Sequence, residues 1–270
     1  MAMNPPIQTS SRIIHAFIWM VIVGVFVSAC GSTGSTAGVS AVTTPTVSPA
    51  QGAGFTSSVL ANGQVDALPP GTLFANILSI SQPASSSIPA HSHVAIFIYE
   101  ASGIQALAIQ GQTSLTMQAG SAAFLPNHVT HTHSNPGSST NLWYVIGIRP
   151  RGVVTTPPNL TTTPLYSTPD LPAFVPGAYS EVLRLATLQP GGRSPAHKHG
   201  GLEVILVLDG TLTLHSLGQP PQTLTAGQGA YVLPNTPLQV LNTGGTVGKY
   251  LAFLAWPVGQ PFQTNVSQAP

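Results

Sequence analysis

Charged residues are scarce in this chain. Seven Lys and Arg and six Asp and Glu make up 5% of its 270 residues, against about 25% in ordinary soluble domains. No segment forms a basic stripe, so nucleic acid is not expected as a partner. The polar surface must come instead from Ser, Thr, Gln, Asn and Gly. The composition does not fix an oligomeric state.

Cysteine is as scarce as charge. Cys30 is the only cysteine, which excludes an intramolecular disulfide. The sequence also lacks the Gly-x-Ser-x-Gly elbow of many serine hydrolases. A conventional serine or cysteine hydrolase is therefore not expected.

The N-terminal segment has the features of an export signal. Arg12 precedes an apolar run over residues 13–29, which ends in small residues directly before Cys30. This ending resembles the lipobox of bacterial lipoproteins. The resemblance implies a signal peptide at 1–29, lipidation of Cys30, and attachment to the cell membrane or envelope outside the cytoplasm. The alternatives are an uncleaved anchor helix, although a spanning helix needs about 20 residues, or an ordinary signal peptide with a chance cysteine.

Two segments of low complexity divide the remainder. Residues 31–58 are rich in Ser, Thr, Gly, Ala and Pro and carry no charge, so we predict a flexible tether over 30–58. A Pro- and Thr-rich stretch predicts an inter-domain linker over 152–172. These boundaries leave two domains, at 59–151 and 173–260.

The sequence predicts an all-β fold for both domains. Short apolar runs are separated by Gly, Pro and Asn, and none has sustained helical spacing. The expected strands include 94–99, 106–109, 122–125, 142–148, 203–208, 211–215, 230–233 and 249–255.

The second domain contains a metal-ligand pattern. His197 and His199 are one residue apart, so on a strand they share a face, and Gly200 and Gly201 let the backbone bend before Glu203. Two imidazoles and a carboxylate with open positions suit iron(II), and manganese, nickel, copper and zinc accept similar ligands. The cofactor expected is therefore a divalent transition metal whose identity the pattern leaves open.

The full spacing, Gly-x5-His-x-His-x3-Glu-x6-Gly, resembles the first signature of the cupin family. A weaker copy with His91 and His93 lies 106 residues upstream. The chain thus resembles a bicupin over roughly residues 70–258. The resemblance implies two tandem cupin-type double-stranded β-helix (jelly-roll) barrels, each packing two sheets around a small-ligand cavity.

A second cupin signature supplies the remaining ligands of the first domain. By this resemblance His131 is its third histidine, and His133, two residues further, shares its face as a possible fourth ligand. The carboxylate position falls at Phe97. Strand alternation points Glu100 to the opposite face from Phe97, so the predicted first site is His91, His93 and His131.

The same signature in the second domain has no histidine. Counting from Pro234 places Gln239 at the last ligand position, and counting back from Asn242 places Leu238 there. A neutral amide is a poorer ligand than imidazole, so His197, His199 and Glu203 form the predicted second site. Arg184 is a candidate for holding an anionic substrate through paired hydrogen bonds.

Two classes of function remain. Resemblance to bicupin dioxygenases and decarboxylases implies a metalloenzyme acting on a small oxygenated substrate. The alternative is a lipid-anchored module that binds or senses a metal or small ligand without turnover. A third reading, in which the histidines are relics of a lost metal site, also stays open.

Overall fold

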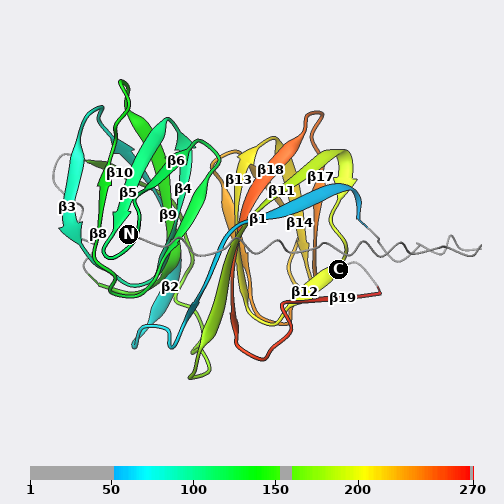
Figure 1. The fold of residues 1–270 in the computed structure, drawn as a ribbon. Coiled ribbons are helices and arrows are strands. Elements are labelled where there is room, and N and C mark those ends of the chain that lie inside the picture. Colours follow the sequence, from blue (N-terminus) through cyan, green and yellow to red (C-terminus); the bar gives the residue numbers. More distant parts are fainter. Residues whose placement is uncertain (1–51, 153–159, 268–269) are drawn as a thin grey trace, which may run out of the picture. The chain divides into compact units, whose positions relative to one another are not determined.

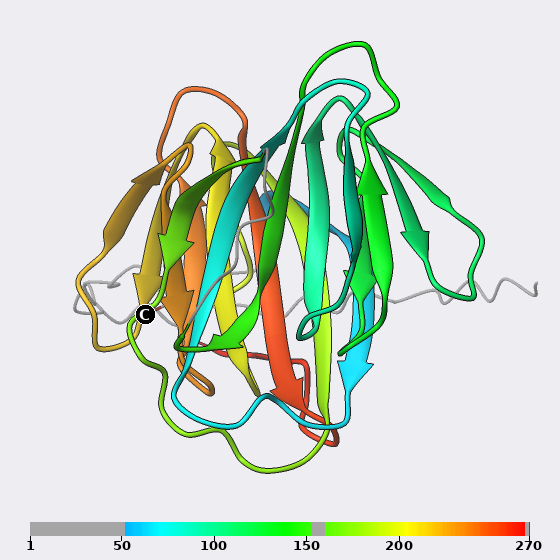
Figure 2. The same ribbon diagram turned by 90° about the vertical axis from the view of Figure 1, so that its left-hand side faces the viewer.

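The computed structural model describes residues 52–152, 160–267 and 270. Every regular element in these ranges is a strand, and both ribbon views consist of arrows and loops (Figures 1 and 2). The described part contains no helix long and apolar enough to cross a membrane. The predicted all-β class is confirmed, whereas Cys30 and the predicted signal peptide lie outside the described residues.

The first barrel is built from two sheets. The larger has the order β10-β2-β9-β4-β7 and the smaller β3-β8-β5-β6. Their bounds are Thr161–Ser167 (β10), Leu73–Gln82 (β2), Asn141–Pro150 (β9), Ile96–Ser102 (β4), Ala122–Leu125 (β7), Ser87–His91 (β3), His131–Ser134 (β8), Ile104–Ile109 (β5) and Leu115–Gln118 (β6).

The second barrel is one continuous ten-stranded sheet. Its main path is β15-β14-β17-β11-β18-β13-β16, with β1 paired to β11 and β12 paired to both β17 and β19. The bounds are Gln222–Thr225 (β15), Thr211–Ser216 (β14), Leu238–Asn242 (β17), Tyr179–Arg193 (β11), Gly248–Pro257 (β18), Leu202–Asp209 (β13), Gly229–Val232 (β16), Ala53–Val65 (β1), His197–His199 (β12) and Gln263–Asn265 (β19). The long β11 pairs first with β18 and then, at Arg193, with β17, so one strand connects both layers.

Two strands correct the predicted domain boundaries. β1 begins inside the predicted tether and pairs with β11 along its length, so residues 53–65 belong to the second barrel (Figure 1). β10 lies inside the predicted linker and pairs with β2 as an edge strand of the first barrel. Pro164 lies next to a register shift of this edge strand, a place where a missing N–H is tolerated.

Alternation along the strands sorts side chains between the three larger hydrophobic cores. On β4, Ile96 and Ile98 fill the interior of the first barrel, whereas Phe97 faces a core shared by the two barrels. There Phe97 lies 5.8 Å from Phe253 between ring centroids. On β13, Ile205 faces the interior of the second barrel. This alternation determines which polar side chains can enter each barrel.

Candidate metal centres

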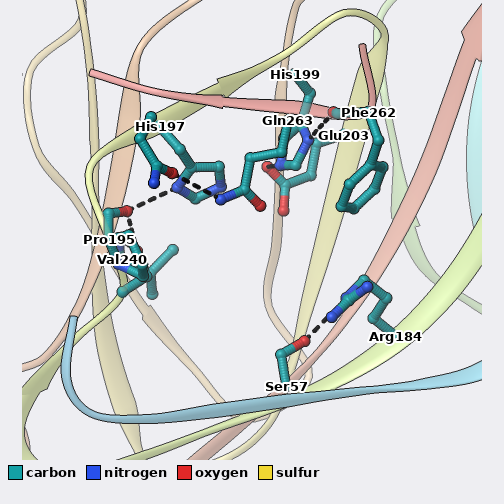
Figure 3. Close-up of polar contacts among 11 residues, drawn as sticks. Ser57, Arg184, Pro195, His197, His199, Glu203, Val240, Phe262 and Gln263 are labelled. Carbon is teal, nitrogen blue, oxygen red and sulfur yellow. Dashed lines mark hydrogen bonds and ion pairs between the residues drawn. The ribbon is translucent and has the colours of Figure 1, made fainter. Parts of the chain in front are cut away.

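The second barrel brings its predicted triad together. β12 carries His197 and His199, and β13 carries Glu203 on the interior face that it shares with Ile205. One ligand atom from each of the three residues lies within 4.8 Å of the others. All three side chains are buried, with exposed fractions of 6%, 6% and 3%. Figure 3 shows the triad converging from the two strands.

Backbone carbonyls fix the orientation of both rings. His197 Nδ1 lies 2.7 Å from the carbonyl oxygen of Pro195, and His199 Nδ1 lies 2.6 Å from that of Phe262 (Figure 3). A carbonyl can only accept, so Nδ1 carries the proton and Nε2 keeps its lone pair. This is the arrangement in which histidine binds a metal.

The electrostatics of the triad favour its neutral forms. Burial lowers the pKa of His199 to about 4, lowers the pKa of His197, and raises the pKa of Glu203. His199 Nε2 and Glu203 Oε2 are 3.6 Å apart, yet these pKa directions oppose an ion pair between them. Glu203 Oε2 is buried without a hydrogen-bond partner. A divalent cation would satisfy that oxygen and the two Nε2 atoms, so the residues present fit a metal.

The triad opens into a small cavity of about 50 Å³. Arg184 lies on its wall, and its Nε donates to Ser57 Oγ on β1 at 3.0 Å (Figure 3). Phe262 and Gln263 also line the cavity, although the predicted domain ends at residue 260. These two residues were missed because they approach the histidines only through the pairing of β12 with β19.

Gln239 does not reach this cavity. On β17 its neighbours Leu238 and Val240 face the interior core, so Gln239 points to the other side. There it donates to the carbonyl oxygen of Ser194 at 2.9 Å. Leu238 pairs with His197 as His131 pairs with His91 in the first barrel, so an apolar residue occupies the third-histidine position.

The candidate ligand cluster of the first barrel consists only of histidines and contains no carboxylate. Ligand atoms of His91, His131 and His133 lie within 4.8 Å of one another. His93 lies outside this set, although its ring centroid is 4.7 Å from that of His131. The structure therefore places His133 in the tight group and His93 at its edge. The sequence predicted His93 as a ligand and His133 only as a possible fourth.

Carbonyl oxygens orient these rings as well. His91 and His131 each place Nδ1 2.8 Å from the carbonyl two residues earlier, and His93 Nδ1 lies 2.7 Å from the oxygen of Val94. His131 Nε2 is buried without a partner. His133 differs, because its ring stacks on Trp143 at 4.9 Å and its Nδ1 has no hydrogen bond. The cluster therefore presents free imidazole nitrogens, as a metal requires.

The carboxylate position of the first barrel is Ile96, not Phe97. Ile96 pairs with Leu125 as Glu203 pairs with Val232. Matching the two halves by sequence spacing alone is wrong by one residue at this position. The segment from His93 to Ile96 is one residue shorter than the segment from His199 to Glu203. Glu100 faces away from Phe97, as predicted. It lies on the face of β4 that carries Ile96 and Ile98 into the interior core, and it is fully buried there.

Matched turns support the equivalence of the two motifs. The N–H of His128 donates to the carbonyl of His93, and that of Asn235 to the carbonyl of His199, both at 2.7 Å. His128 and Asn235 have φ of 59° and 61°, in the left-handed region that both residue types tolerate. His128 is thus a turn residue and belongs to neither cluster.

Comparisons with known proteins agree with this architecture. A search of curated proteins finds no match. Similar solved structures are AerE from Microcystis aeruginosa (16% identity, TM-score 0.50, 73% of this chain and 98% of that chain covered), vicilin from Capsicum annuum (10%, 0.51, 72% and 80%) and oxalate decarboxylase from Lactobacillus farciminis (10%, 0.51, 75% and 88%). Identities this low establish the fold alone.

A family model provides the sequence-level link. The model for the cupin domain matches residues 184–254, which include His197, His199 and Glu203. The preceding barrel has a related strand register and its own His-x-His pair, His91 and His93. The sequence of the second barrel thus matches the cupin domain over residues 184–254, and the barrel before it is a second all-β barrel with a related histidine motif.

Proposed function

We propose that each barrel binds one divalent transition metal ion. The observation that carries this proposal is the shared tautomer of the histidines. Five of them place Nδ1 on a backbone carbonyl, which leaves Nε2 free: His91, His93, His131, His197 and His199. His131, His197 and His199 are buried, and relic histidines would have no reason to keep free nitrogens there, since buried polar groups are costly without a partner.

The two sites differ in the ions that they favour. The three imidazoles of His91, His131 and His133 in the first barrel suit the later first-row ions nickel, copper and zinc. The set with Glu203 in the second barrel also accepts iron(II) and manganese. The chain thus offers two chemically distinct centres.

We propose further that the protein is a metalloenzyme of the dioxygenase or decarboxylase type acting on a small oxygenated substrate. A bound ion would polarise the substrate or activate dioxygen or water. The guanidinium of Arg184 would hold the anionic end of a substrate in the second barrel, with its Nε already oriented by Ser57. The cavity of about 50 Å³ restricts that substrate to a few heavy atoms.

A non-catalytic binding or sensing module is the second candidate. The same small cavity favours it, because Glu203 is the only carboxylate that lines the space and it serves as a ligand. Turnover separates the two candidates. Metal-loaded protein should consume dioxygen or release carbon dioxide from small carboxylates, and metal-free protein should not. Tight metal binding without turnover of such substrates would favour the module.

We also propose that Cys30 is lipidated and attaches the protein to the outer side of a cell membrane. The apolar run before Cys30 and the small residues next to it support this location.

A further inference from the structure

The first barrel carries an arginine that the sequence did not single out. Arg149 lies near the end of β9 on the face of Trp143 and Val145, which fill the barrel interior. Two residues earlier, a Cβ on Gly147 would stand 3.0 Å from the carbonyl oxygen of Ala95. Arg149 therefore emerges beside the segment that follows the first histidine motif.

The pairing of β9 with β4 directs this arginine toward the histidine motif. Ile146 lies opposite Phe97, so Arg149, three residues further along β9, extends past the start of β4 toward the segment that follows His93. The exposed fractions of His91 and His93 are intermediate, so this end of the barrel is open to a ligand.

The guanidinium of Arg149 has no counter-ion among the described residues. Its Nε is buried without a hydrogen-bond partner, and the ion pair of Arg151 with Asp170 does not involve it. Burial lowers the pKa of Arg149 to about 10, so the group stays charged at neutral pH. A desolvated and uncompensated charge is costly, and an anion with two oxygens would satisfy the planar fork.

A polar acceptor accompanies this donor. Asn76 lies opposite Gly147 on β2, is 3% exposed, and leaves Oδ1 without a partner. Arg149 and Asn76 lie two residues apart along the same face of this strand pair. The pair therefore offers a charged donor and a neutral acceptor near the histidines.

The second barrel shows that this polarity is no requirement of the fold. Strand register matches Asn76, Gly147 and Arg149 to Val182, Leu254 and Trp256. All three are apolar, and Trp256 packs on Phe262 at 5.1 Å between ring centroids. The polar pair is thus particular to the first barrel.

We infer that Arg149 and Asn76 bind a small hydroxycarboxylate beside the first histidine cluster. The carboxylate receives hydrogen bonds from the guanidinium, and the hydroxyl donates to Asn76 Oδ1. This inference rests on the proposed function for the role of the ligand as a substrate, but binding of the anion needs no metal.

An NMR titration of the full chain tests the inference in metal-free protein. The chain has five arginines, so their side-chain ¹⁵Nε resonances can be assigned by substitution. Glycolate should shift the Arg149 resonance saturably, and acetate, which lacks the hydroxyl, should bind several-fold more weakly. Arg149→Gln should weaken glycolate binding at least tenfold. Arg151→Gln is the matched control, because Arg151 is exposed and pairs with Asp170 at 2.6 Å.

The remaining variants separate binding from folding. Asn76→Val introduces the residue of the second barrel and should remove the preference for glycolate over acetate. Arg149→Lys keeps the charge and should retain folding with reduced affinity. An unshifted Arg149 resonance in the wild type, or equal losses in Arg149→Gln and Arg151→Gln, would overturn the inference. Metal content is measured separately, so failure of the metal sites would not be mistaken for failure of the anion subsite.

Discussion

In the proposed metal centres, single side chains would decide which ion each barrel accepts. Glu203 is the only carboxylate in either cluster, and its negative charge is what favours iron(II) or manganese. In the second barrel Leu238 occupies the position of the third histidine, His131. In the first barrel Ile96 occupies the position of the carboxylate, Glu203. Three positions thus account for the chemical difference between two similar folds.

Substitution of Glu203 tests the second centre. Glu203→Gln keeps the shape of the side chain but removes the charge, so affinity for iron(II) or manganese should fall at least tenfold while the first centre keeps its ion. Competitive metal titration measures both. Asp209→Asn is the control, because Asp209 ends the same strand and is exposed. Equal losses in the two variants would contradict the assignment.

Substitution of His131 tests the first centre. His131→Leu introduces the residue that the second barrel has at this position, Leu238, so the fold should tolerate it. Binding of a nickel-, copper- or zinc-like ion to the first barrel should be lost, and binding at Glu203 should persist. Retention of both ions in this variant would show that the histidine cluster is not the site.

The sequence predicts part of these centres well. His197, His199 and Glu203 follow from strand periodicity and spacing within seven residues, which are local properties. Phe262 does not, because its carbonyl reaches His199 only through strand pairing across 63 positions. The choice between His93 and His133 depends on how loops direct the rings, which a spacing pattern does not encode.

At the scale of elements, β4 carries a polar residue into an apolar core. Glu100 has no exposed surface and no hydrogen bond to either oxygen, and the matching residue in β13 is Val207. Gln105, on β5, is likewise buried with both polar side-chain atoms unpartnered, and its counterpart is Leu212. The first barrel therefore keeps a polar layer where the second is hydrophobic.

This layer predicts a pH dependence of stability. Burial raises the pKa of Glu100 from 4.5 to about 7. The unfolded chain loses the proton first, so stability should fall as pH rises from about 4.5 to about 7, by on the order of 3 kcal/mol. In Glu100→Gln this contribution should be absent, and the variant should be more stable than the wild type at pH 8. Denaturant unfolding across this range measures the difference, and identical slopes would disprove it.

Element positions were harder to predict than element types. The eight strands expected from apolar runs all coincide with strands of the structure, which has nineteen in the described residues. The apolar runs could not show that β1 joins the second barrel or that β10 joins the first, because both pairings connect distant segments. Their Ser-, Thr- and Gly-rich sequences resemble linkers until a partner strand satisfies the backbone.

At the scale of the whole molecule, the chain combines an expected membrane attachment with two linked barrels. Cys30→Ser should abolish incorporation of labelled fatty acid and leave an unprocessed precursor, because no other cysteine can take the lipid. Radiolabelling and electrophoretic mobility report both effects. Continued acylation of the variant would remove the lipoprotein assignment.

The central claim is that both barrels bind metal, and metal stoichiometry tests it most directly. The purified protein, loaded with an excess of a mixture of divalent ions and then desalted, should retain two ions per chain by elemental analysis. His131→Leu and Glu203→Gln should each retain one, and the double variant none. A wild-type protein that retains no ion under these conditions would contradict the account and leave the histidines as relics.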